Sequence, residues 1–190
     1  MSTMKYASLD LGTIEAVFNK LGGTEGAQRL LRGELVVSES PKLAILNFHE
    51  DVLVGPLTKQ FVPNESFKNR PGLYLWNDMS RVLRSAQIVK SAEATKSRSF
   101  DLTKDAYDRD IKAELPTKHE IELWQIAELI GAQEKGEDGS LLTNGYANIF
   151  YVAGCAVRVR WDAGRREWFV SDWGLDDDQW HRGPRVFSSN

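Results

Sequence analysis

The acidic residues near the C-terminus are the first side chains of this sequence that could support chemistry. The group comprises Glu167, Asp172, Asp176, Asp177, Asp178 and His181. Carboxylates with an imidazole can hold Mg²⁺ or Mn²⁺ and assist phosphodiester hydrolysis. The spacing does not match an EF-hand, because the required glycine and twelfth-position glutamate are missing. Segment 172–181 therefore predicts either a metal-dependent phosphodiesterase or an exposed acidic turn, and the sequence favours the turn without metal ligands.

A catalytic cysteine is the second possibility, because a thiol beside a base can act as a nucleophile. The chain has one cysteine, Cys155, and its histidines are His49, His119 and His181. Cys155 falls in a predicted hairpin turn, and we expect it to be inert. The short motifs of P-loop NTPases, zincins, zinc ribbons and nucleophile elbows are absent from the sequence. We therefore predict no catalytic residue and no cofactor, and we favour a protein that is not an enzyme.

A basic stretch in the middle of the chain could bind nucleic acid. Residues 57–100 carry 8 basic and 3 acidic side chains, whereas residues 101–190 carry 11 and 17. Basic side chains among aromatics can bind single strands through phosphate contacts and stacking. The candidate residues are Lys68, Arg70, Arg81, Arg84, Lys90, Lys96 and Arg98. The net charge of −3 opposes this interpretation, which we keep as an alternative.

Large aromatic side chains gather near the C-terminus. Four of the six tryptophans are Trp161, Trp168, Trp173 and Trp180. In AVRVRW (156–161) the alternation places Val157 and Val159 on one side of a strand and the arginines on the other, but in EWFVSDW (167–173) both sides carry aromatics. Either a second layer covers the second face, or an aromatic patch is exposed and binds a partner.

Our first functional hypothesis is a non-enzymatic protein-interaction module. Aromatic side chains supply much of the binding energy at protein interfaces, and charges at the rim tune the encounter. The predicted binding residues are Trp168, Trp173, Asp176, Asp177, Asp178 and Trp180. The partner would be an unknown protein, with nucleic acid as the alternative.

The pattern of apolar residues predicts an α+β fold. Residues 13–32 form a helical hairpin, with Thr13 as N-cap and Gly22-Gly23 as the break between the helices. Short apolar runs at 35–37, 43–48, 52–57 and 73–76 have strand length, and a short helix follows them. SAEATKSRSF (91–100) is small, polar and basic, which is typical of a loop.

The C-terminal half is predicted to be a capped helix packed on an antiparallel β-meander. Thr117 and Glu120 form a capping-box pattern before a helix over 120–130. Strands are expected at 147–153, 156–162, 167–173 and 185–188. The whole chain, 1–190, would form one compact domain with a possible sub-boundary at the polar loop 91–103, which separates 1–90 from 104–190.

The sequence also predicts a cytoplasmic setting. A single cysteine excludes an intramolecular disulfide, as is usual in reducing compartments. The first residues lack the apolar run of a signal peptide, and no window has the 18 apolar residues of a membrane span. We expect a soluble protein that does not bind membranes.

Two parts of the chain resemble a group of uncharacterised bacterial hypothetical proteins that occur as several divergent copies per genome. The matching parts are LGGTEGAQRLLRGELVV (21–37) and a block from LWQIAEL (123–129) through LLTNGYANIFYV (141–152) to RVFS (185–188). Together they cover about half of the chain. The group has no established activity or site, so the resemblance implies a bacterial cytoplasmic origin and no function.

Overall fold

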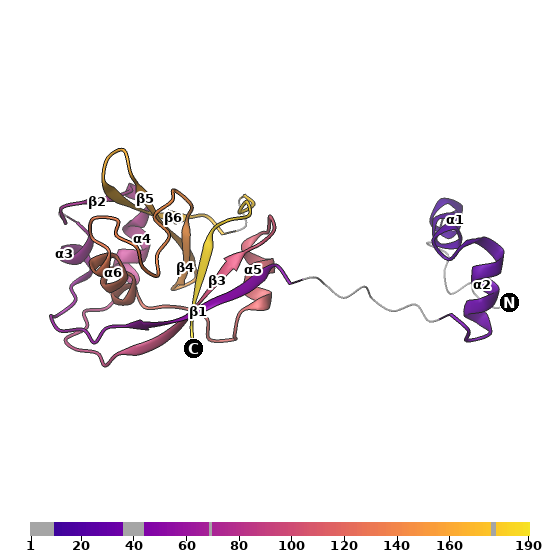
Figure 1. Cartoon of the computed structure of the whole chain (residues 1–190), viewed down its shortest axis with the longest axis horizontal. Coiled ribbons are helices and arrows are strands. Elements are labelled where there is room, and N and C mark those ends of the chain that lie inside the picture. The colour runs from indigo at the N-terminus through magenta and orange to yellow at the C-terminus, as the bar shows by residue number, and fades with distance from the viewer. Residues whose placement is uncertain (1–9, 36–43, 69, 176–177) are drawn as a thin grey trace. The chain divides into compact units, whose positions relative to one another are not determined.

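A computed structural model describes residues 10–35, 44–68, 70–175 and 178–190 (Figure 1). The chain divides into two compact units, Met1–Leu43 and Ala44–Asn190. The described part of the first unit is a pair of helices, and the second unit holds a mixed β-sheet with helices between its strands. The predicted α+β class is confirmed. None of the helices in these described ranges is both long and apolar enough to cross a bilayer.

The predicted helical hairpin is confirmed with shifted ends. The helices are α1 (Leu11–Lys20) and α2 (Gly23–Leu31). The Asp10 carboxylate accepts a hydrogen bond from the Thr13 amide, so Asp10 is the N-cap and Thr13 lies inside the helix. Gly22 separates the two helices. Its φ of 88° is a left-handed conformation that glycine adopts without strain.

The second unit is built on one seven-stranded sheet with the order β1-β3-β7-β4-β5-β6-β2 (Figure 1). The strands are β1 (Leu46–Val54), β2 (Leu73–Leu75), β3 (Thr95–Leu102), β4 (Asn148–Val152), β5 (Cys155–Asp162), β6 (Glu167–Trp173) and β7 (Arg185–Ser189). Two pairs, β2–β6 and β4–β7, are parallel, and the other neighbours are antiparallel. The short runs predicted at 43–48 and 52–57 are parts of the single strand β1, and residues 36 and 37 of the first predicted strand lie outside the described residues.

The predicted meander is confirmed for three strands and wrong for the fourth. The strands β4, β5 and β6 form two consecutive antiparallel hairpins. The last strand, β7, does not pair with β6 but lies between β3 and β4. Val186 and Phe187 on adjacent positions are both fully buried, so β7 needs a covered position inside the sheet.

The predicted loop at 91–103 is also wrong, because β3 runs through it. Ser97 and Ser99 point to a covered face and are fully buried, and the strand is paired on both sides by β1 and β7. A run of small polar residues is typical of loops, but here the two ladders satisfy its main-chain groups. The prediction of a single domain over 1–190 stays a prediction.

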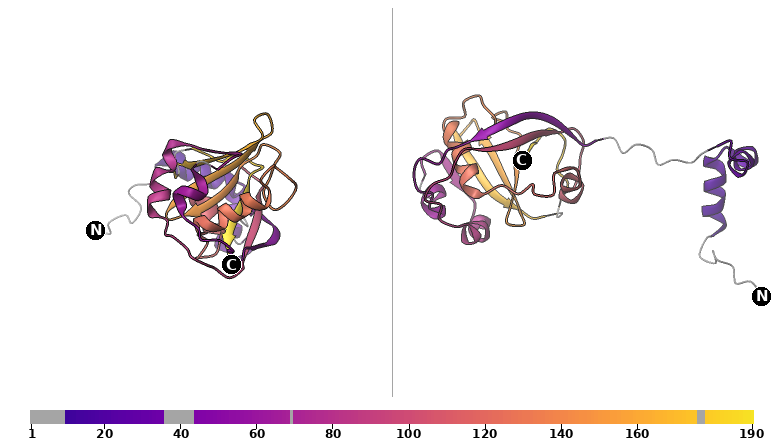
Figure 2. Two further views of the ribbon diagram at one scale, coloured as in Figure 1. Left: turned by 90° about the vertical axis from the view of Figure 1, so that its left-hand side faces the viewer. Right: turned by 90° about the horizontal axis from the view of Figure 1, so that it is seen from below.

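The helices of the second unit cover the sheet on two sides (Figures 1 and 2). They are α3 (Pro63–Phe67), the 3₁₀ helix η1 (Asn77–Met79), α4 (Ser80–Ser85), α5 (Asp108–Glu114) and α6 (Leu123–Ala132). The expected capped helix is α6, but its capping box is formed by Glu122 and Gln125, not by Thr117 and Glu120. The helix begins later than predicted because Glu122 is the residue whose carboxylate accepts from the first turn.

Two apolar cores follow from this arrangement. One core packs α6 and α4 against Phe150, Val157 and Trp168 of the sheet. The other packs α5 against Ile149 and Tyr151, which alternate with the residues of the first core. The second core reaches across β3, β7 and β4 to Ala156 at the start of β5, and Trp173 of β6 lies at its margin. On the side of the sheet that α5 covers, the other described residues of β5 and β6, and those of β2, are not part of the second core.

Gly136 provides a test of the first core. It has a φ of 74°, and an added Cβ would overlap the indole ring of Trp161. Gly136→Ala should therefore lower the free energy of unfolding by about 2–4 kcal/mol, from backbone strain and overpacking together. Gly154→Ala is the matched control, because Gly154 has a φ of 75° with no atom near its Cβ position. Urea unfolding of both variants measures the difference, and equal losses would contradict the contact with Trp161.

Candidate functional site

Two of the tryptophans predicted to bind a partner lie in the cores. Trp168 has no exposed surface, and its Nε1 donates to the Gln133 carbonyl oxygen at 2.7 Å in the first core. Trp180 is 5% exposed and belongs to the second core, where its Nε1 donates to Asp108 Oδ1 at 2.9 Å. Their rings lie in different cores, so they do not form one surface.

The buried carboxylate of Asp108 explains why Trp180 lies inward. Its Oδ1 also accepts from the Tyr151 hydroxyl at 2.7 Å, so α5, β4 and the segment before β7 meet at one carboxylate. A buried donor without its acceptor costs free energy.

Asp108→Ala should therefore destabilise the protein by about 2–4 kcal/mol, because the donors of Tyr151 and Trp180 each lose an acceptor. Asp110→Ala is the matched control on the same helix, since Asp110 is part-exposed and its carboxylate lies 3.9 Å from the Arg109 guanidinium. It should change stability by less than about 0.5 kcal/mol. Thermal or urea unfolding measures both variants, and equal effects would contradict this role of Asp108.

The other predicted binding residues lie near β6. Trp173 is half-buried, with its ring centroid 5.4 Å from that of Trp180. Asp178 is exposed, and its Oδ1 accepts from the Gln179 amide at 2.8 Å. Asp176 and Asp177 lie outside the described residues.

The described carboxylates and the imidazole of the acidic segment do not converge on one point, as the ligands of a metal ion would. Asp172 turns toward α4, where its Oδ2 pairs with Arg81 at 2.9 Å, and its side chain is only 7% exposed. His181 contacts Asp105 instead, with 3.0 Å between Nδ1 and Oδ2. Within the described ranges, no group of three or more His, Cys, Asp or Glu side chains is placed to hold a metal ion.

The pair of His181 and Asp105 makes a pH-dependent prediction. The hydrogen bond to Asp105 raises the pKa of His181 above its ordinary value, with a smaller electrostatic contribution from Asp178. Because the folded-state pKa is raised, this contribution to stability is complete below the unfolded pKa and is lost as the pH rises through the folded pKa. In an NMR titration, the imidazole midpoint should fall in Asp105→Asn and fall less in Asp178→Asn. An unchanged midpoint in Asp105→Asn would contradict the pairing.

Cys155 is buried at the start of β5, beside Asp172 and Arg81. Burial and the neighbouring Asp172 carboxylate raise the pKa of the thiol, against the opposite effect of Arg81. Its sulfur donates to the Ala153 carbonyl oxygen at 3.9 Å. A thiol with a raised pKa is a poor nucleophile at neutral pH, which argues against covalent catalysis here.

The basic residues of segment 57–100 are distributed over distant parts of the sheet. Lys96 and Arg98 lie on β3, whereas Lys68 and Arg81 lie close to β2 in sequence, and four strands separate β3 from β2. Several of the cations are already held within the fold. Arg70 donates to the Ala127 carbonyl oxygen at 3.1 Å, Arg81 pairs with Asp172, and Arg98 lies 3.7 Å from Asp51. Arg84 and Lys90 are exposed.

The structure brings together a different group, on the side of β5, β6 and β2 that the described helices of the second unit leave uncovered. We name it the aromatic–arginine face, and it comprises Tyr74, Trp76, Arg158, Arg160, Arg165 and Phe169. The strand register explains the assembly, because Phe169 on β6 is the partner of both Tyr74 on β2 and Arg160 on β5. Side chains of paired residues lie on the same side of a sheet.

The rings and guanidinium groups of this face make two sets of contacts, one around Phe169 and one at Trp173. The Tyr74 centroid lies 5.8 Å from Trp76 and 5.1 Å from Phe169. The guanidinium carbons of Arg165 and Arg160 lie 5.4 Å and 5.8 Å from the Phe169 centroid. The guanidinium carbon of Arg158 lies 4.3 Å from the ring centroid of Trp173, which Ser171 separates from Phe169 on the same side of β6. These distances are those of aromatic and cation–π pairs.

The face carries three arginines, and the paired carboxylates Asp162 and Glu167 lie on the same side of the sheet at its β5–β6 turn. No carboxylate of the described ranges lies within ion-pair distance of Arg158, Arg160 or Arg165. Burial lowers the pKa of Arg158, and the nearby charge of Arg160 lowers it further, while Asp78 acts in the opposite direction. Holding these cations close together is unfavourable, and an anion bound between them would relieve the repulsion.

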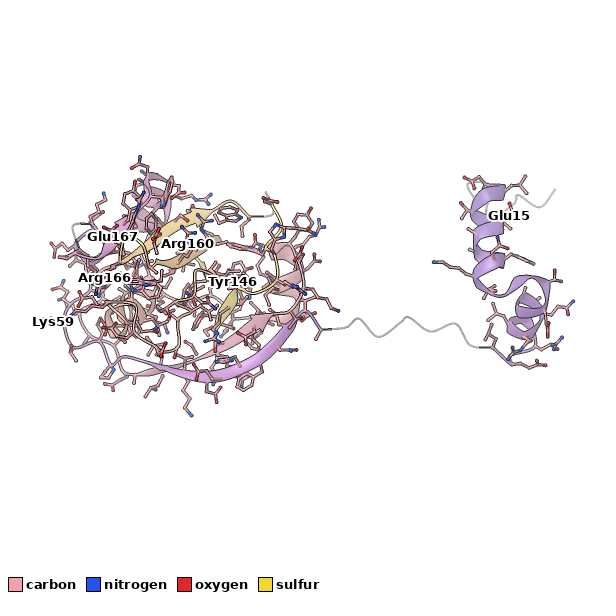
Figure 3. The ribbon with its side chains drawn as sticks, turned by 45° about the horizontal axis from the view of Figure 1, so that its top comes forward. Glu15, Lys59, Tyr146, Arg160, Arg166 and Glu167 are labelled. Carbon is pink, nitrogen blue, oxygen red and sulfur yellow. The ribbon has the colours of Figure 1, made fainter. Side chains whose placement is uncertain are left out.

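The β5–β6 turn closes one end of the face. Arg166 follows Arg165 in this turn, and Glu167 begins β6 (Figure 3). Tyr74 and Trp76, on the β2 side of the face, are 44% and 47% exposed, so their rings are accessible to a ligand.

Sequence reasoning found half of this face. The alternation in AVRVRW placed Arg158 and Arg160 opposite the apolar side chains, which the structure confirms. The contribution of Tyr74 and Trp76 was missed, because they come from a segment about ninety residues earlier. In the sequence, the indication for Tyr74 and Trp76 was their alternation with the two leucines in LYLW (73–76).

No protein-family model, curated protein or solved structure matches this chain. The resemblance to bacterial hypothetical proteins therefore stays an expectation, and the function is argued from the geometry of the face.

Proposed function

We propose that this protein is a non-enzymatic binding module that holds a single-stranded nucleic acid on its aromatic–arginine face. The observation that carries the proposal is the combination of three arginines without described carboxylate partners and two exposed aromatic rings on one side of the sheet. The arginines fit the phosphate of a nucleotide, and the aromatic rings fit its base.

The guanidinium groups fit the phosphates. The guanidinium carbons of Arg160 and Arg165 lie 5.8 Å and 5.4 Å from the centroid of the Phe169 ring, a contact that uses none of their N–H donors. An arginine held in this way loses less conformational freedom when a phosphate binds, and its planar group can make paired hydrogen bonds. The face therefore provides an oriented set of donors for a polyanion.

The exposed rings fit the bases. Trp76 and Tyr74 offer their surfaces at the margin of the sheet, where unpaired bases can stack. Bases in a duplex are already stacked on one another, so this arrangement favours a single strand. Three strands at about 4.8 Å spacing give a platform about 10 Å wide, enough for two or three bases.

The acidic remainder of the protein limits the strength of binding. The net charge is −3, so attraction of a polyanion depends on the local cluster of arginines and not on the whole molecule. With about three phosphate contacts, the logarithm of the association constant should fall with that of the salt concentration with a slope of about −2.

A protein ligand is the competing interpretation, since Trp, Tyr and Arg also dominate protein interfaces. The arginines without partners favour a ligand with regularly spaced negative charges, which a single strand has in every nucleotide. Trp168, Trp180 and the acidic segment have no part in this proposal.

The first test is binding of a fluorescein-labelled dT8 oligonucleotide to the full chain, followed by fluorescence anisotropy at several salt concentrations. Trp76→Ala should weaken binding by about 5- to 100-fold through lost stacking. Arg160→Ala and Arg165→Ala should each weaken it by about 3- to 10-fold and make the salt slope shallower by about 0.7.

Lys96→Ala and Arg98→Ala are the matched controls, because they remove exposed basic residues at the far end of the sheet. They should leave the affinity unchanged within twofold. Equal effects of control and face variants, or binding that ignores salt, would sink the proposal. A stoichiometric protein partner that survives nuclease in a pull-down and is lost in Trp76→Ala would assign the face to protein binding instead.

A further inference from the structure

A cavity with a volume of about 390 Å³ lies where the start of α6, the chain that follows α4 and the β4–β5 turn meet. We name it the α6 cavity, and the residues that line it include Phe61, Glu120, Glu122, Trp124, Val152 and Ala153. Its volume lies in the range of about 300–1,000 Å³ that is usual for small-molecule sites. The α6 cavity shares none of its described lining residues with the aromatic–arginine face, so its role does not depend on the proposed function.

The floor of the α6 cavity is apolar and preformed. Phe61, Trp124 and Val152 line it, and all three side chains are buried. They are packed among the other residues of the first core, which fixes their positions. An apolar floor of this kind can hold the hydrocarbon part of a ligand.

Two glutamates bring negative charge to the α6 cavity, and main-chain amides fix both carboxylates. Glu122 is the N-cap of α6, and its side chain accepts from the Gln125 amide. Its Oε2 also accepts from Trp124 Nε1 at 2.7 Å, which places this carboxylate beside an indole ring of the cavity floor. Glu120 Oε1 accepts from the Gly154 amide at 2.8 Å, which places the second carboxylate at the β4–β5 turn.

The charge of the α6 cavity favours a cationic ligand. Among the described residues that line it there is no lysine, arginine or histidine. Within the described part of the chain, no cation lies within ion-pair distance of Glu120 or Glu122. The Glu122 carboxylate already caps the N-terminus of α6, so an anion would meet a carboxylate there and not free amides. Both carboxylates keep further lone pairs that can accept from a cation.

We propose that the α6 cavity binds a primary ammonium group on an apolar stem. The ammonium group pairs with the carboxylates of Glu120 and Glu122, and the stem packs against Trp124 and Phe61. A small organic amine and the lysine side chain of a peptide share this chemistry. The site gives the protein a second class of ligand, opposite in charge to the strand proposed for the aromatic–arginine face.

Isothermal titration calorimetry of the full chain with phenethylamine tests the class of ligand. Phenethyl alcohol has the same ring and stem without the charge, and 3-phenylpropionate has a negative charge. The alcohol should bind about 10- to 100-fold more weakly than the amine, because it lacks the charge-assisted contacts, and 3-phenylpropionate should not bind measurably. Equal affinities for the amine and the alcohol, or no binding of the amine at millimolar concentration, would overturn the inference.

Glu120→Gln and Glu122→Gln test the two carboxylates, because each variant keeps an oxygen that can accept from the main chain and loses the charge. Each should weaken binding of phenethylamine by about 3- to 30-fold and leave that of phenethyl alcohol within twofold. The affinity for the alcohol also reports whether the cavity is intact. Glu128→Gln is the matched control, since it removes the same charge from α6 outside the cavity lining. A loss in Glu128→Gln equal to that in the other two variants would contradict the site.

An NMR titration locates the bound amine. The indole N–H of Trp124 donates to Glu122, so its ¹H–¹⁵N signal should shift as phenethylamine is added. The indole signal of Trp168, which donates to the Gln133 carbonyl oxygen in the first core, should stay in place. Trp124→Phe assigns the signal, because that variant lacks it. Binding that leaves the Trp124 signal unchanged would place the amine elsewhere and refute the inference.

A second ligand distinguishes the two sources of the ammonium group. Nα-acetyl-lysine methylamide presents a lysine side chain with the main chain of a peptide. Tighter binding of this compound than of phenethylamine, with the same dependence on Glu120 and Glu122, would support the α6 cavity as a site for a lysine of a partner protein. Weaker binding with that dependence would support a small organic amine.

Discussion

The structure depends on a sheet that is covered on one side over almost its whole width and on the other side over only part of it. Every residue of β4 is buried, because α6 packs on one side of this strand and α5 on the other. Further along the sheet, at β5, β6 and β2, the second core ends near Trp173. The aromatic–arginine face lies where the described helices of the second unit end and the strands continue beyond them.

Arginine side chains provide the cover that helices do not. The guanidinium groups of Arg158 and Arg160 lie over Trp173 and Phe169, and Phe169 is only 8% exposed as a result. An exposed cation–π contact stabilises by about 0.5–1 kcal/mol, which is small enough that a ligand can share or displace it. The same groups can therefore shield an apolar surface in the free protein and donate hydrogen bonds to a bound anion.

Sequence periodicity predicted most of the elements, and it failed where the partner of an element is distant in the chain. The alternation in AVRVRW was sufficient to predict β5 and the outward direction of its arginines. The serines of β3 looked like a loop, because their burial depends on strands on both sides and not on their own polarity. Trp168 and Trp180 could be placed on a face or in a core only when Gln133 and Asp108 were known to accept from their indole nitrogens.

What the sequence alone determined is the local structure: the helical hairpin, the helix α6, the antiparallel strands β4 to β6 and the side of the strand on which each of their residues lies. Only the tertiary structure decided that β7 enters the sheet beside β4 and that β2 closes its far end beside β6. The physical reason is that the period of the hydrophobic residues specifies which face of a strand is buried. The order of the strands depends instead on segments about ninety residues apart that are buried against each other. The candidate site lies at such a junction, where Tyr74 meets Phe169, and for that reason it could not be read from either segment alone.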